Sequence, residues 1–120
     1  MPNDKTMYSL PHENLIAYRV ACDLLVAVVE ARICDLGLRD QALRAAKSAC
    51  LNIAEANGRV SPADRRRVFA IARGEAAEAA AAVHIAALAG ECSGESAAKA
   101  RQLGGHAVAL LTGLIRYTPA

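Results

Sequence analysis

The fold is decided by one stretch, residues 61–90, which reads SPADRRRVFAIARGEAAEAAAAVHIAALAG. It opens with Ser61 and Pro62, a pair typical of a helix start, because serine caps free backbone N–H groups and proline tolerates the first helical position. An acid follows in the first turn, where the helix dipole favours negative charge. Gly90 comes after the last apolar residues and favours a helix end. The stretch therefore predicts a long helix over 62–89.

Two helical patterns precede this stretch. Apolar residues recur in steps of three and four from position 15 onward, which predicts a helix over 12–35. Gly37 is placed to end it in a left-handed conformation, and Asp40 is placed to cap the next helix. That next helix is predicted over 40–57.

A last pattern follows the stretch and predicts a helix over 94–117 that ends before Pro119. Four helices joined by connections of a few residues must run antiparallel to their sequence neighbours. The 28 alanines and the absence of tryptophan among 120 residues also favour helices. We therefore predict an all-α protein, an antiparallel up-down-up-down four-helix bundle with one domain over 12–117 and a flexible tail over 1–11.

Composition and segment lengths exclude several classes. No apolar run reaches the roughly 20 residues that a bilayer requires, and the N-terminal residues lack the apolar core of a signal peptide. The four cysteines form no CxxC motif, so we expect reduced thiols. These features predict a cytoplasmic protein with no membrane partner.

Catalytic motifs are missing from the sequence. It contains no Glu-x-x-His pair, no complete HExxH pattern, and no Walker A, GxSxG or GxGxxG motif. Glu75 and Glu78 stand three residues apart, but such carboxylates are more often solvated or paired with basic residues than catalytic. We therefore expect no enzymatic activity, no catalytic residues, no metal and no cofactor.

Basic residues concentrate between positions 39 and 73, where eight stand against three acidic ones. Around the turn that joins the second and third predicted helices, this excess predicts a nucleic-acid contact surface formed by Arg59, Arg65, Arg66, Arg67 and Arg73. Arg66 and Arg73 are seven residues apart and are expected on one outward side of the helix. For Arg67, pairing with a carboxylate such as Glu55 is an alternative. The whole pattern also fits a solvated surface in which Glu55 and Arg59 form an ion pair four residues apart.

The predicted helix over 62–89 is apolar around most of its circumference, because alanines occupy much of its remaining face. Such a helix is usually buried on more than one side, which favours contact with another subunit. The expected interface residues are Ala77, Ala80, Ala81 and His84. The alternative is that the alanines face water and only strengthen the helix.

Four segments resemble a known family, the 23S rRNA intervening-sequence proteins. Residues 52–59, NIAEANGR, are similar to its NIAEGxGR segment, and residues 72–78, ARGEAAE, to its ARGSLAE segment. Residues 110–116, LLTGLIR, resemble its MLNGLIR segment, and residues 15–21 its LxVYxxA start. The sequence departs from the pattern at Glu75, where the family has serine, at positions 56 and 57, where it has glycine and an aromatic, and in a shortened first loop.

The resemblance implies a four-helix bundle that assembles into a homo-oligomeric ring, with a pentamer as the expected state. It implies a non-enzymatic role, and related accessory proteins of diversity-generating retroelements bind nucleic acid and a reverse transcriptase through a basic surface. Asn52, Glu55 and Glu78 match the family segments and are expected to do structural polar work between helices or at loops. The sequence thus predicts a scaffold that binds nucleic acid, in particular RNA; the alternative is a protein–protein assembly or adaptor module.

Overall fold

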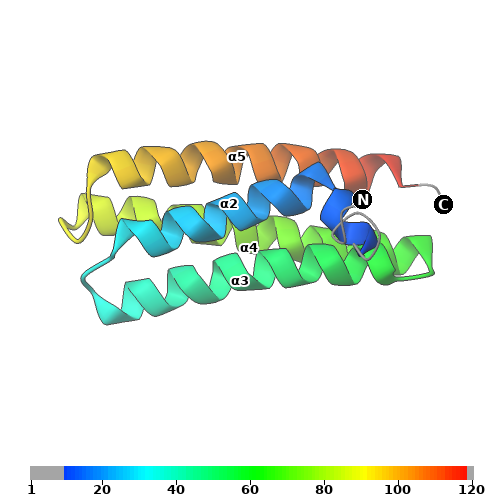
Figure 1. The fold of residues 1–120 in the computed structure, drawn as a ribbon, viewed down its shortest axis with the longest axis horizontal. Coiled ribbons are helices and arrows are strands. Elements are labelled where there is room, and N and C mark those ends of the chain that lie inside the picture. The colour runs from blue at the N-terminus through cyan, green and yellow to red at the C-terminus, as the bar shows by residue number, and fades with distance from the viewer. Residues whose placement is uncertain (1–9, 119–120) are drawn as a thin grey trace, which may run out of the picture.

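The computed structural model describes residues 10–118, which form a short 3₁₀ turn and four long helices and contain no strand. The elements are η1 (Pro11–Asn14), α2 (Ile16–Ala31), α3 (Leu36–Gly58), α4 (Pro62–Leu88) and α5 (Gly94–Tyr117). The α2–α3 and α4–α5 connections lie at one end of the molecule, and the α3–α4 connection lies at the other (Figure 1). The all-α class with four helices is confirmed. Most of the predicted tail, residues 1–9, lies outside the described residues.

The start and end of α4 follow the predicted signals. The side chain of Ser61 accepts a hydrogen bond from the backbone N–H of Asp64, and Pro62 occupies the first turn. Beyond the helix, Gly90 takes the left-handed conformation, with φ of 76°. Ser93 caps α5 in the same way as Ser61 caps α4, by accepting from the N–H of Ser96 at 3.0 Å. Serine caps therefore set the first residues of both helices.

The predicted end of α2 and the predicted start of α3, on either side of the connection over 32–35, were wrong. Helix α2 ends at Ala31 rather than at 35, and Arg32 instead of Gly37 takes the left-handed conformation, with φ of 48°. Helix α3 begins four residues early because Asp35, not Asp40, caps it through a 2.8 Å bond from the N–H of Leu38. Gly37 therefore lies inside the first turn of α3. The apolar spacing misled the prediction because Ile33, only 1% exposed, enters the core from the connection and not from a helix.

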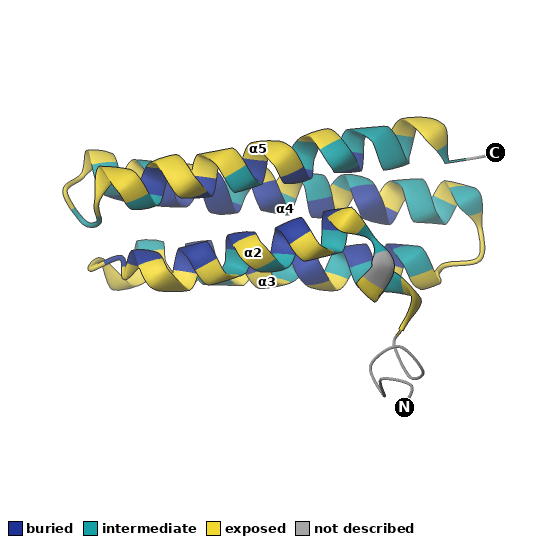
Figure 2. Ribbon diagram, turned by 45° about the horizontal axis from the view of Figure 1, so that its top comes forward, coloured by how far each residue is buried: buried dark blue, intermediate teal, exposed yellow. Residues whose placement is uncertain are grey.

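Small side chains dominate the core and let the helices approach closely. Buried residues line the inner faces of the four helices (Figure 2), and most of them are alanines. Helices α4 and α5 approach closely at Gly104, where an added Cβ would lie 2.6 Å from the Cβ of Ala80. Larger side chains, led by Phe69 and Leu24, fill the space between the helices. This packing fixes α5 against α4 and so positions the polar side chains along their joint.

Candidate nucleic-acid interface

The predicted arginine cluster lies at the end of the bundle that carries the α3–α4 connection. Arg59 directly follows α3, and Arg65, Arg66 and Arg67 lie in the first two turns of α4. The beginning of α2 and the end of α5 lie at the same end of the molecule (Figure 1). We call this region the arginine end.

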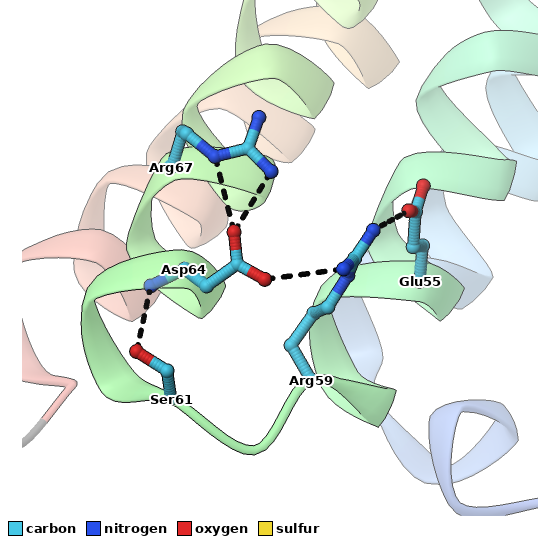
Figure 3. Close-up of polar contacts among 5 residues, drawn as sticks. All are labelled: Glu55, Arg59, Ser61, Asp64 and Arg67. Carbon is cyan, nitrogen blue, oxygen red and sulfur yellow. Dashed lines mark hydrogen bonds and ion pairs between the residues drawn. The ribbon is translucent and has the colours of Figure 1, made fainter.

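Two of the arginines are held by carboxylates. Asp64 accepts from Arg67 Nη2 at 2.8 Å and from Arg67 Nε at 3.1 Å, and its other oxygen lies 3.3 Å from Arg59 Nη1 (Figure 3). Arg59 also donates to Glu55, the ion pair four residues apart that the sequence suggested. The alternative considered for Arg67, a carboxylate partner, is realised with Asp64 and not with Glu55.

These contacts shift the pKa values of Asp64 and Arg59. The hydrogen bond from Arg67, followed by the positive charge of Arg59, lowers the pKa of Asp64. The hydrogen bond to Glu55 and the charge of Asp64 raise the pKa of Arg59. Because all of these side chains reach solvent, the pairs are worth little to stability and mainly orient the guanidinium groups.

Arg66 and Arg73 lie on the other flank of α4, against α5. Arg66 Nη1 donates to the backbone carbonyl of Thr118 at 3.3 Å, and Arg73 Nη1 donates to the hydroxyl of Thr112 at 3.3 Å. Both arginines are half-buried. They share one side of the helix as expected, but that side faces the joint with α5, which corrects the prediction that they project outward.

Arg65 lies between these two flanks, next to the core side of α4. Its Nε atom is buried and has no hydrogen-bond partner in the structure, while the residue as a whole is half-buried. The five predicted arginines therefore lie on different sides of the N-terminal half of α4 and on the connection before it, instead of forming one flat patch.

Sequence reasoning missed two residues at this end, Arg116 and Tyr117. Both are exposed in the last turn of α5 and directly precede Thr118, whose carbonyl accepts from Arg66. The short predicted connections already implied that α5 ends beside the start of α4, so the topology was the signal that would have found them. With Arg116, six arginines of α4, α5 and the α3–α4 connection lie toward this end, and Glu55 and Asp64 are the acids that pair with them. Arg19, in the first turn of α2, lies at the same end and donates to the carbonyl of Glu13 at 3.2 Å.

The three polar residues assigned structural roles, Asn52, Glu55 and Glu78, make different contacts, and that of Glu55 is the ion pair with Arg59 described above. Glu78 joins α4 to α3, because its carboxylate lies 2.8 Å from Arg44 Nη2. Arg44 Nη1 also lies 3.6 Å from the carboxylate of Glu75, so Glu75 and Glu78, three positions apart, both pair with Arg44. Asn52 bonds within α3, donating to the carbonyl of Ser48 at 2.8 Å.

The residues expected at a subunit interface do not share one environment. Ala77 and Ala81 are exposed on α4, and His84 beside them is half-exposed. Ala80, in contrast, is only 8% exposed because it packs against Gly104 of the same chain. The exposed pair continues along α4, in steps of three and four residues, to the solvent-exposed apolar side chains of Ile85 and Leu88, and we call this row the apolar ridge of α4. Ala80 is thus a contact inside the bundle.

Other kinds of site are not seen in the part of the chain that the structure describes. Residues 10–118 contain no group of three or more histidine, cysteine, aspartate and glutamate side chains able to hold a metal ion. In the same residues, every helix is too short or too polar to cross a bilayer.

Four helices pack around an alanine-rich core, and arginines gather at one end of the bundle. These features define a small four-helix protein with one positively charged end. The chain belongs to the 23S rRNA-intervening sequence protein family, whose profile matches residues 13–113. This match confirms the family suggested by the four sequence segments. A comparison with curated proteins finds no match.

Proposed function

We propose that this protein is a non-enzymatic, homo-oligomeric scaffold that binds RNA through the arginine end and acts in the cytoplasm. The observation that carries the proposal is the gathering of six arginines, from α4, α5 and the α3–α4 connection, around two paired acids. Such a local excess of positive charge attracts phosphates and releases their condensed counterions on binding.

The contacts available at this end favour the phosphate backbone over base edges. Guanidinium groups bind phosphate oxygens with two parallel hydrogen bonds, and those of Arg59 and Arg67 are already oriented at the surface by Asp64. Phe69 is only 1% exposed and offers no stacking surface, whereas the ring of Tyr117 is exposed beside Arg116. Binding in this proposal is therefore tolerant of sequence, and one unpaired base stacks on Tyr117.

Assembly is the second part of the proposal. The antiparallel bundle leaves the apolar ridge of α4 uncovered, where Ile85 is 51% and Leu88 76% exposed. Exposed apolar surface of this kind is typical of subunit contacts. In the expected pentameric ring, five arginine ends act together, so weak phosphate contacts add up to strong binding.

The test compares two double variants that lose the same charge. Arg59→Gln with Arg67→Gln removes two exposed cations from the arginine end, and Arg39→Gln with Arg101→Gln removes two exposed cations from the opposite half. Affinity for a single-stranded RNA is measured at several salt concentrations. The first variant should lose affinity, and its log–log salt slope should become shallower by up to about 0.7 for each arginine lost. The control variant should keep most of the wild-type slope.

Equal losses in the two variants would mean that only net charge matters and would overturn the assignment of the arginine end. Absence of RNA binding by the wild type at low salt would overturn RNA binding itself. The exposed ridge of α4 then favours the second candidate, a protein–protein assembly module, provided that the oligomer persists.

A further inference from the structure

Two connections meet at the end of the bundle opposite the arginine end (Figure 1). The backbone N–H of Cys34, between α2 and α3, donates to the carbonyl oxygen of Glu91, between α4 and α5, at 3.0 Å. That carbonyl belongs to the peptide unit that joins Glu91 to Cys92. This bond places the backbone of Cys34 directly beside the peptide unit that precedes Cys92, and a disulfide needs two Cα atoms about 4.4–6.8 Å apart.

The backbone of Cys92 is held from both sides. The N–H groups of Gly90 and Glu91 donate to carbonyls in the last turn of α4, at 3.1 and 2.8 Å, which closes the helix end. Ser93 then caps α5. The half-buried Cys92 thiol points back to α4 and donates to the carbonyl of Val83 at 3.5 Å.

The backbone of Cys34 is held as firmly, but its side chain is exposed. Its neighbour Ile33 is buried in the core, and its other neighbour Asp35 caps α3. The two cysteines therefore differ in solvent accessibility. An oxidant in solution reaches the exposed Cys34 more readily than the half-buried Cys92 next to it.

The electrostatics of the two thiols agree with this closeness. Burial, and then the proximity of Cys34, raise the pKa of Cys92. The other two cysteines lie on the helices, Cys22 on α2 and Cys50 on α3. Burial and the nearby Cys22 raise the pKa of Cys50 to about 12. Cys50 is also buried, so an oxidant in solution reaches it less readily than the exposed Cys34.

We propose that Cys34 and Cys92 form an intramolecular disulfide when the protein meets a peroxide. The Cys34 thiolate attacks one oxygen of hydrogen peroxide, which gives a sulfenic acid and releases hydroxide. The Cys92 thiolate then attacks the sulfur of that sulfenic acid, forms the S–S bond and expels a second hydroxide. The two hydroxides take up the two thiol protons as water, so two thiols are oxidised and one peroxide is reduced to two waters.

The bond joins the two helical hairpins at their open end. The α2–α3 hairpin and the α4–α5 hairpin are linked covalently through the α3–α4 connection at the arginine end. A disulfide at the opposite end closes the chain between residues 34 and 92 and restricts the unfolded state. The oxidised protein should therefore unfold at a higher temperature, with Tm raised by more than about 5 °C.

The experiment treats the reduced protein of 120 residues with hydrogen peroxide, blocks the remaining thiols and digests the product with trypsin without reduction. Each cysteine falls in its own tryptic peptide: 20–32, 33–39, 48–59 and 74–99. We expect peptides 33–39 and 74–99 to appear as one linked species that lacks two hydrogen atoms and separates on reduction. Cys34→Ser and Cys92→Ser should each abolish the linked species and the rise in Tm. The matched control, Cys22→Ser with Cys50→Ser, should keep both.

A linked species of peptides 20–32 and 48–59 would overturn the proposal. So would a disulfide between two chains, or accumulation of sulfinic acid on Cys34 in the wild type with no link. If Cys92→Ser fails to fold, the exposed Cys34→Ser variant decides the question alone, since loss of the linked species there is required.

Discussion

The contact between Gly104 and Ala80 allows a sharp test of the packing that holds α5 against α4. In Gly104→Ala, the new methyl group would lie 2.6 Å from the Cβ of Ala80, so one helix must move. Overpacking of this kind costs about 1–3 kcal/mol. The same substitution gains up to about 1 kcal/mol of helix propensity. The net effect on the free energy of unfolding is therefore a loss of up to about 2 kcal/mol.

The next residue supplies the control. Gly105 lies in the same helix, is exposed, and has no atom within 4 Å of a built Cβ. Gly105→Ala should therefore show only the gain in helix propensity, about 1 kcal/mol. The difference between the two variants isolates the steric term, about 1–3 kcal/mol.

Urea and thermal unfolding followed by circular dichroism measure this difference. For a chain of 120 residues, 1 kcal/mol corresponds to about 4 °C in Tm. Adding Ala80→Gly to Gly104→Ala removes the facing methyl group, and the double-mutant cycle should then show a favourable coupling of at least about 1 kcal/mol. Equal stabilisation by Gly104→Ala and Gly105→Ala would refute the close approach of the two helices.

Three further predictions concern polar groups. Ser93→Ala removes the cap of α5 and should cost about 1 kcal/mol in urea unfolding. Glu78→Gln weakens a largely solvated pair with Arg44 and should cost less than about 1 kcal/mol, a loss that vanishes at high salt in the same assay. Because Arg67 lowers the pKa of Asp64, ionised Asp64 adds stability above about pH 4 that is lost as the pH falls further. Asp64→Asn should therefore make the acid side of a stability–pH profile shallower, and an unchanged profile would contradict this role.

Local signals predicted the elements well where the side chain that decides the boundary is close in sequence. The cap at Ser61 acts three residues ahead, so it was visible in the sequence. The connection over 32–35 was not, because an apolar residue with helical spacing, Ile33, fills the core from a non-helical position. Periodicity alone cannot distinguish these two ways of burying a side chain.

The candidate site was predicted in composition but not in arrangement. The pair of Arg59 and Glu55 follows from their spacing, whereas the bond between Arg59 and Asp64 depends on the turn between them. The contact of Arg73 with Thr112 depends on how closely α5 packs on α4, which spacing does not determine. Cys34 and Cys92 are brought close by a hydrogen bond between two connections that are far apart in the sequence. Their proximity therefore could not be predicted from the sequence either.

The central claim is that this chain forms an oligomer that carries RNA on its arginine ends. Native mass spectrometry of the protein purified without nuclease treatment reports subunit number and bound nucleic acid together. We predict a mass of five chains with additional mass that ribonuclease removes, and a marked loss of that additional mass in the Arg59→Gln, Arg67→Gln variant. A single chain without bound RNA at micromolar concentration would contradict the claim.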